Sequence, residues 1–229
     1  MQTIDSPPQL ADGARPSSPP TMPLGSPARH RLGYAASKRL LDVAAAAVGL
    51  LLLSPLLAAA AVAVKLSSPG PVLFRQERVG RYGRPFRIDK FRSMRVNATG
   101  PSVTAGGDAR ITRVGRLLRR TKLDELPQLW NVLAGDMSLV GPRPEVRRFV
   151  DRFPADYARI LTVRPGITDF AAVEYRDEES VLAGAADAEA AYLETVLPAK
   201  IRLYHRYLDE MSLRTDLTLV VRTLAALLR

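Results

Sequence analysis

The sequence predicts a mostly helical α+β fold with a small strand element, preceded by an apolar helix that is hinged at its centre. Three observations predict it: a long uncharged run near the N-terminus, short apolar segments around two glycines, and later stretches that repeat leucine and valine at helical spacing. The chain divides into a tail at 1–36, a membrane helix at 37–66 and one domain at 67–229.

The N-terminal tail is rich in proline. Residues 1 to about 34 hold seven of the 18 prolines, with Ser, Gly and Ala between them and no apolar period. Such a segment cannot bury enough surface to offset the entropy lost on ordering. We therefore expect a disordered tail, and not a signal peptide, because no small-residue cleavage site closely follows the apolar run.

The apolar run from Val43 to Val64 is 22 residues long and carries no charge. As a straight helix it would extend roughly 33 Å, which is long enough to span a bilayer. Ser54 and Pro55 lie at its centre, where the proline removes a backbone hydrogen bond, so we expect a kink or break at this pair.

The charges that flank the run help to choose a topology. Lys38 and Arg39 precede it and Lys65 closes it, and positive residues at both ends favour having both ends on the cytoplasmic side. We predict a re-entrant helix-hairpin in a bacterial inner membrane, hinged at Ser54 and Pro55, with the domain on the cytosolic face. A kinked spanning helix and a buried core helix are the alternatives.

The domain begins after a turn-rich linker at 67–71. We expect a strand pair at 72–74 and 86–88 and helices at 113–123, 126–133, 188–207 and 213–228. The last stretch has arginines among its leucines and valines, which is typical of an interfacial amphipathic helix, although a core-facing helix fits equally well.

Composition and charge limit the chemistry. The chain has no cysteine, so thiol catalysis and disulfides are excluded, and its two histidines are far apart, which gives little support to a Ser-His triad or a histidine metal site. The formal charge is +10, and residues 75–122 hold 14 basic and 3 acidic residues. Such a segment implies an anionic partner: nucleic acid, lipid headgroups or a phosphorylated small molecule.

The basic segment ends in two adjacent carboxylates, Asp124 and Glu125. Before them, Arg113, Arg116 and Arg120 fall along one side of a helix, and guanidinium groups clamp phosphate oxygens in pairs, as a pyrophosphate requires. Among so many cations we expect both carboxylates to be ionised and able to hold a divalent cation or attack phosphorus. The alternatives are a basic face on anionic lipid and an ordinary surface Asp-Glu pair.

A series of short motifs resembles one family. In chain order these are Lys38-Arg39-x-x-Asp42, Ser54-Pro55, Pro69-Gly-Pro71-Val-x-Phe74, Gln76-x-Arg78-x-Gly80, Lys90-Phe91-Arg92-Ser93-Met94, Leu123-Asp124-Glu125-Leu-Pro-Gln128-x-x-Asn131, Gly135-Asp136-Met-Ser138-x-Val-Gly141-Pro-Arg143-Pro144-Glu145 and Arg164-Pro-Gly166-Ile-Thr168. Over about residues 36–229 the chain is similar to bacterial sugar transferases known as monotopic phosphoglycosyl transferases.

The resemblance implies a two-step reaction at the bilayer surface that depends on Mg²⁺. Asp124 would attack a UDP-sugar and expel UMP, and a polyprenyl phosphate would then collect the phosphosugar. Glu125 would share the metal with Asp124 or handle a proton. The candidates for substrate contacts are Lys90, Arg92, Arg119, Arg120, Arg143 and Asp169. Beyond Thr168 the sequence departs from the version common in members that start long polysaccharides, so the donor sugar stays open.

The rival hypothesis is a membrane-anchored basic protein that binds anionic lipid or nucleic acid without catalysis. Nucleic acid is not an expected partner, because no zinc-finger spacing or evident base-stacking platform accompanies the basic segment. A conventional metal-dependent glycosyltransferase is disfavoured because there is no Asp-x-Asp pair and no glycine fingerprint of a nucleotide-binding unit. The sequence leaves open whether the protein forms a homodimer.

Overall fold

The computed structural model describes residues 28–96, 108–175, 182, 184–185 and 187–227. Most of the predicted tail, 1–27, lies outside the described residues. Helix α1 runs from Ala28 to Ser67, so residues 28–36, which the sequence assigned to the tail, are helical.

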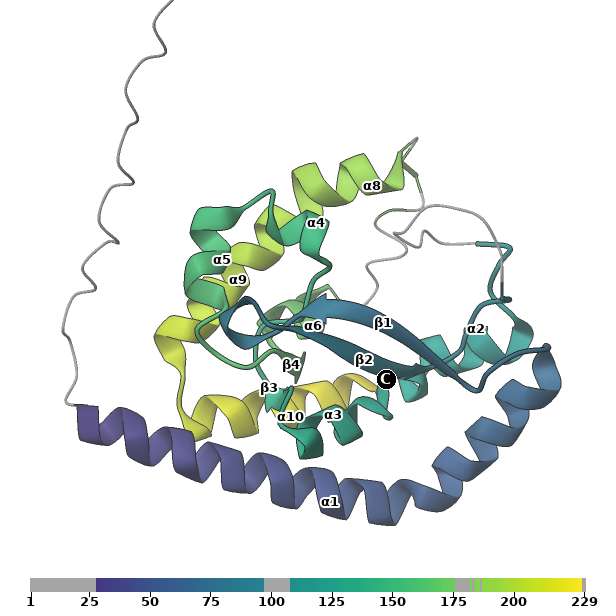
Figure 1. Ribbon diagram of the computed structural model, residues 1–229, viewed down its shortest axis with the longest axis horizontal. Helices are drawn as coiled ribbons and strands as arrows, with labels where there is room; N and C mark the ends of the chain where they lie inside the picture. Colours follow the sequence, from purple (N-terminus) through teal and green to yellow (C-terminus); the bar gives the residue numbers. More distant parts are fainter. Residues whose placement is uncertain (1–27, 97–107, 176–181, 183, 186, 228–229) are drawn as a thin grey trace, which may run out of the picture.

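Helix α1 stays continuous through Pro55. Figure 1 shows it lying along one side of the molecule, with its second half turned away from the direction of the first. The Ser54 hydroxyl donates a 2.8 Å hydrogen bond to the Leu51 carbonyl, which is the group that Pro55 has no N–H to serve. The kink or break expected at this pair is thus a bend in one helix, and α1 is not divided in two.

One side of α1 faces away from the rest of the chain and is apolar. Leu51 and Leu66 are 74% and 81% exposed, whereas Ala46 and Val64 are fully buried. The stretch Gly33–Ser67 is long and apolar enough to cross a membrane, by length and composition alone. A membrane anchor is therefore plausible for this helix.

Both halves of α1 bind the same globular unit. In the first half, the Asp42 carboxylate accepts hydrogen bonds from the Ser138 hydroxyl at 2.7 Å and the Leu139 N–H at 3.1 Å. In the second half, Ala60 and Val64 pack into one apolar cluster with Phe91. The helix therefore lies along the domain and does not project from it.

The predicted strand pair is present. Strands β1 (Leu73–Val79) and β2 (Pro85–Phe91) are antiparallel, and their register runs from Leu73 opposite Phe91 to Val79 opposite Pro85. The short helix η1 (Arg81–Gly83) joins them, with Tyr82 at φ 59° and Gly83 at φ 74°. Strands β3 (Ser138–Val140) and β4 (Gly166–Thr168) form a second, parallel pair that the sequence did not predict.

Helices make up most of the remaining described chain. They are α2 (Arg113–Arg120), η2 (Leu123–Glu125), α3 (Gln128–Ala134), α4 (Arg147–Val150), α5 (Pro154–Ile160), α6 (Phe170–Glu174), α8 (Ala188–Ala191), the π-helix η3 (Tyr192–Val196), α9 (Leu197–Glu210) and α10 (Leu213–Leu227). The helices expected around 113–123, 126–133, 188–207 and 213–228 are confirmed, and the mostly helical α+β class with them.

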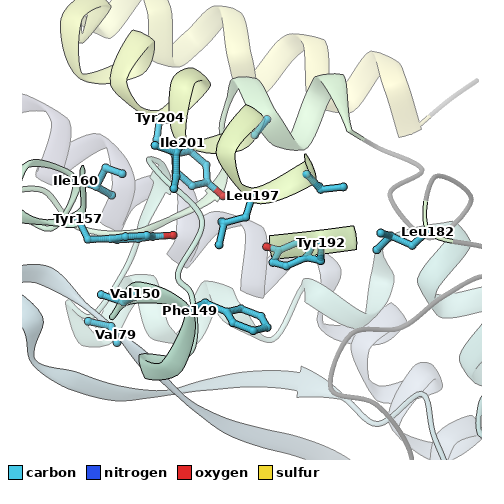
Figure 2. Close-up of a cluster of buried hydrophobic side chains, with 12 residues drawn as sticks. Val79, Phe149, Val150, Tyr157, Ile160, Leu182, Tyr192, Leu197, Ile201 and Tyr204 are labelled. Atoms are coloured by element: carbon cyan, nitrogen blue, oxygen red, sulfur yellow. The ribbon is translucent and has the colours of Figure 1, made fainter. Parts of the chain in front are cut away.

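The main core lies on the side of the molecule away from α1 (Figure 1). Figure 2 shows its side chains, among them Phe149, Tyr157, Leu197 and Tyr204, which come from α4, α5 and α9. Helix α10 buries Leu219 in a separate cluster but leaves Leu217 67% exposed. Helix α10 therefore has one apolar side in the core, as expected of a core-facing helix, and a second apolar side that is exposed, as an interfacial helix requires.

Candidate active site

The two carboxylates of the candidate site lie in η2, between α2 and α3. Helix α2 begins at the N-cap Thr112, whose hydroxyl accepts from the Gly115 N–H, and it ends before Lys122, which has a left-handed backbone at φ 56°. This reversal brings Asp124 and Glu125 beside strand β2, which carries Lys90.

Glu125 is held by two cations. Lys90 Nζ donates to Oε1 at 3.0 Å, Arg143 Nη1 donates to Oε2 at 3.0 Å, and Arg143 Nη2 donates to Oε1. Burial alone would raise the pKa of Glu125, but the charges of Arg143 and Lys90 hold it well below its ordinary value. Glu125 therefore anchors both cations, and the direction of its pKa shift favours the ionised form that the sequence predicted.

Asp124 has the opposite environment. It is 6% exposed, and its Oδ1 atom is buried without a hydrogen-bond partner among the described residues. Burial and the neighbouring Glu125 charge raise the pKa of Asp124, outweighing the opposing charges of Lys90, Arg119 and Lys122. The direction of this shift contradicts the expectation that the cationic surroundings would favour its charged form, because desolvation is the larger effect.

Lys90 comes from β2 and Arg119 from α2, and the charges of both act on Asp124. The backbone just before Lys90 is fixed by Asn131, whose side chain accepts from the Asp89 N–H at 3.0 Å and donates to the Arg87 carbonyl at 2.8 Å. Burial lowers the pKa of the Lys90 ammonium, and the Glu125 charge opposes that change. Arg119 Nη1 donates to the Ser93 hydroxyl at 3.3 Å.

Arg143 sits on a rigid loop between β3 and α4. Its backbone N–H donates to Asp169 Oδ2 at 3.1 Å, and the Gly141 N–H donates to the Thr168 carbonyl at 3.0 Å. Gly141 and Gly166 pack backbone against backbone, since a methyl group on Gly166 would lie 2.1 Å from the Gly141 nitrogen. The parallel strand pair thus fixes the loop that presents the Arg143 guanidinium to Glu125.

Three predicted substrate contacts have other surroundings. Both carboxylate oxygens of Asp169 accept backbone N–H groups, from Arg143 and from Ala172, so this buried residue caps α6 and holds the arginine loop. Arg92 donates to the carbonyls of Val64, Ser68 and Pro69 and so closes the end of α1. Arg120 is exposed on α2. The structure therefore brings Lys90, Arg119 and Arg143 to the two carboxylates, and gives Asp169 and Arg92 positioning tasks.

The Asp124 carboxylate is the group among the described residues that would hold a divalent cation here. The described residues hold no group of three or more acidic or histidine side chains placed for a metal. Asp124 Oδ1 lacks a partner, whereas both oxygens of Glu125 are committed to cations. Mg²⁺ is commonly held by one or two carboxylates together with substrate phosphates and water, so the site fits a Mg²⁺ that arrives with a phosphorylated substrate.

Behind the arginine loop lies a charged network that the sequence reasoning missed. The buried Glu145 carboxylate accepts from Arg78 Nη1 at 3.3 Å and from the Tyr192 hydroxyl at 2.6 Å, and Lys200 Nζ donates to that hydroxyl at 3.2 Å. Glu145 belongs to a motif that the sequence analysis quoted, but its partners on β1, η3 and α9 have no local signal.

Comparisons with known proteins identify the family of this chain. The family model described as bacterial sugar transferase matches residues 33–229. The chain is 45% identical over 202 residues to an Aeromonas hydrophila protein named UDP-N-acetylgalactosamine-undecaprenyl-phosphate N-acetylgalactosaminephosphotransferase, covering 85% of this chain and 44% of that protein.

The chain also matches two relatives whose names specify UDP-glucose. A Caulobacter vibrioides UDP-glucose:undecaprenyl-phosphate glucose-1-phosphate transferase is 45% identical over 83% of this chain and 69% of its own length. An Escherichia coli protein of the same name is 48% identical over 63% of this chain and 32% of its own length. The chain thus spans less than half of two of these three relatives. Because the family model covers nearly all of it, the chain belongs to the bacterial sugar transferase family.

Proposed function

We propose that this protein moves a sugar 1-phosphate from a UDP-sugar to undecaprenyl phosphate, a polyprenyl phosphate, and releases UMP. One observation carries the proposal: two adjacent carboxylates with opposite environments, a paired and ionised Glu125 and a buried Asp124 whose Oδ1 has no partner among the described residues. The names of the relatives, which specify UDP-sugars and undecaprenyl phosphate, support the substrates.

The reaction follows from the division of roles between the two carboxylates. An Asp124 oxygen forms a bond to the β-phosphorus of the donor while the bond from that phosphorus to the bridging oxygen breaks, and UMP leaves. A phosphate oxygen of the lipid then attacks the same phosphorus and releases the Asp124 carboxylate. Neither step needs an added oxidant or proton source, and one pocket serves a soluble donor and then a lipid acceptor.

The cations around Glu125 would neutralise the phosphate charges. Arg143 and Lys90 are held near Asp124 by their bonds to Glu125, so they are oriented before the substrate arrives. Mg²⁺, bound through Asp124 and the donor pyrophosphate, would supply further neutralisation of the phosphate oxygens. Glu125 would support the metal only through its charge, because its oxygens are already occupied.

A re-entrant seating of α1 is part of the proposal. Residues 42 and 64 are about 33 Å apart along a helix, which is the thickness of a bilayer core, yet both ends of this stretch bind the same domain. A helix that crossed the membrane would carry one of these contact points to the opposite side. We therefore infer that both ends lie on the cytosolic face of the inner membrane, with the leucine-rich side of α1 in one leaflet and exposed parts of α10 at the interface.

The deciding experiment measures UMP release from a panel of UDP-sugars by the protein in Mg²⁺ and detergent. Without acceptor, the wild type should release at most about one UMP per enzyme as the phosphosugar stays on Asp124, and undecaprenyl phosphate should restore turnover. Asp124→Asn should release none, while Arg75→Gln, an exposed site on β1, should behave like the wild type. If no sugar yields UMP but lipid or nucleic acid still binds, the non-catalytic alternative is favoured.

A further inference from the structure

Three arginines from distant parts of the chain meet at the far end of the β1–β2 hairpin from the carboxylates. Arg39 comes from α1, Arg81 from the hairpin turn η1, and Arg164 from the loop before β4. We call Arg39, Arg81 and Arg164 the arginine trio. The reaction proposed above uses none of them.

Backbone carbonyls fix the position of each guanidinium. Arg39 donates to the carbonyls of Val132 at 2.7 Å and Leu133 at 3.2 Å, at the end of α3. Arg164 Nε donates to the carbonyl of Gly135, the C-cap residue of α3, at 2.8 Å. A methyl group on Gly135 would lie 3.5 Å from Arg39 Nη2, so two guanidinium groups converge on one residue.

Arg81 joins them from the hairpin. Its Nε donates to the Thr162 carbonyl at 2.9 Å, two residues before Arg164 in the chain. Burial, and then the charges of Arg39 and Arg81, lower the pKa of the Arg164 guanidinium. Among the described residues, no member of the trio forms an ion pair with a carboxylate.

Capping of α3 accounts for only part of this arrangement. Cations at a helix C-terminus are favourable, which explains Arg39 and one nitrogen of Arg164. It does not explain Arg81, nor the terminal nitrogens of Arg81 and Arg164, which have no hydrogen-bond partner among the described residues. Convergent guanidinium groups that keep free N–H donors and form no ion pair with a described carboxylate are suited to a phosphate group.

The trio is too far from the carboxylates to share their substrate. Lys90 lies near the open end of the strand ladder and Arg81 in the turn at its other end. Lys90 lies five residue steps beyond Pro85, about 17 Å along β2 at about 3.3 Å per step, which exceeds the reach of one pyrophosphate.

The surroundings of the trio indicate which phosphate. Leu40 and Leu41, next to Arg39, are 70% and 55% exposed, on the outer side of α1. Tyr82 is 65% exposed, and the Arg81 guanidinium lies 4.4 Å from the centre of its ring. Exposed leucines, neighbouring arginines and an exposed tyrosine together are typical of a membrane–water interface.

We propose that the arginine trio binds the phosphate group of a membrane phospholipid and so fixes the height and tilt of the domain on the bilayer. This inference rests on the seating of α1 proposed above, but not on the transfer reaction. The lipid is a structural ligand, distinct from the acceptor at Asp124.

Native mass spectrometry of the full chain in detergent tests the site without any UDP-sugar. The wild type should retain phosphatidylglycerol but not a galactosyl diacylglycerol with the same acyl chains, which lacks the phosphate. Arg81→Gln/Arg164→Gln should retain at least about tenfold less phosphatidylglycerol. The matched control Arg148→Gln/Arg152→Gln removes the same charge on and just after α4, and should retain as much as the wild type.

Circular dichroism shows whether each variant keeps its helices, and the single variant Arg81→Gln, which breaks no contact to α3, replaces the double variant if that one is unfolded. Equal losses in both double variants, unchanged retention in the trio variants, or equal retention of the glycolipid would overturn the proposal. So would binding of glycerol 3-phosphate as tight as that of the lipid, which would identify a soluble ligand. Because the lipid-binding test uses no UDP-sugar, its results can be interpreted even if the protein releases no UMP.

Discussion

Arg143→Met tests whether the arginine loop contributes to the reaction. The substitution removes two charge-assisted hydrogen bonds to Glu125 and leaves the Lys90 bond in place. Hydrogen bonds to charged groups contribute about 1.5–3 kcal/mol each, and the side chains of Arg143 and Glu125 are only 27% and 13% exposed, so solvent weakens them little. Because Lys90 remains, we expect a net loss of about 2–3 kcal/mol.

The assay is UMP turnover with donor and undecaprenyl phosphate both present. If the loss falls on the transition state, turnover should fall about 30- to 160-fold, since about 1.4 kcal/mol corresponds to a factor of ten. Arg75→Met is the matched control, because the Arg75–Asp89 pair joins the same hairpin but Arg75 is 61% exposed, and such pairs contribute about 0–1 kcal/mol. Equal turnover in the two variants would refute the role given to Arg143.

Three further predictions follow from the same contacts. If Asp124 attacks as a carboxylate, activity should fall on acidification at a higher pH than for an ordinary aspartate, because the pKa of Asp124 is raised. Glu125→Gln removes the neighbouring charge that contributes to this shift, so the acidic limb of the pH–rate profile should move to lower pH. Asp42→Asn should lower the free energy of unfolding by about 1–3 kcal/mol, and with it the thermal unfolding midpoint, because it weakens the hydrogen bonds to Ser138 and Leu139. An unchanged midpoint would mean that α1 docks by apolar contacts alone. Gly115→Ala should displace α2, because the added methyl would lie 1.9 Å from the Ser93 carbonyl oxygen; wild-type stability in differential scanning calorimetry would contradict this packing.

Local sequence patterns were enough to predict the elements with strong periodicity. The uncharged run, the strand pair around Gly80 and Gly83, and the helices that end in the Asp-Glu pair all have signals within about 20 residues. The strands β3 and β4 have three residues each and lie far apart in the chain, so neither carries a detectable period. Their pairing is decided by the close approach of Gly141 and Gly166, which only the folded backbone reveals.

The contacts that anchor α1 to the domain were likewise not predictable from local sequence patterns. The motif that includes Lys38, Arg39 and Asp42 was visible in the sequence, but its partners were not. Lys38 Nζ lies 3.0 Å from Asp216 Oδ2, and Asp42 pairs with Ser138, so the contacts join residues 178 and 96 positions apart. Local reasoning used these cations only to place the ends of the helix on the cytoplasmic side. The structure adds that they bind the domain, and this contact supports the re-entrant seating proposed above.

In the proposed reaction, the opposite pKa shifts of Asp124 and Glu125 give the two adjacent carboxylates different roles. A single carboxylate cannot both hold Arg143 and Lys90 in fixed ion pairs and offer an oxygen without a partner to phosphorus. Glu125 does the first, since both its oxygens accept from these cations. Burial, and then the charge of Glu125, raise the pKa of Asp124, and a carboxylate of higher basicity is the better nucleophile once it is ionised. Exchanging the two residues should therefore abolish transfer even though composition and net charge are unchanged, because the longer side chain would occupy the buried position and the cations would lose their anchor.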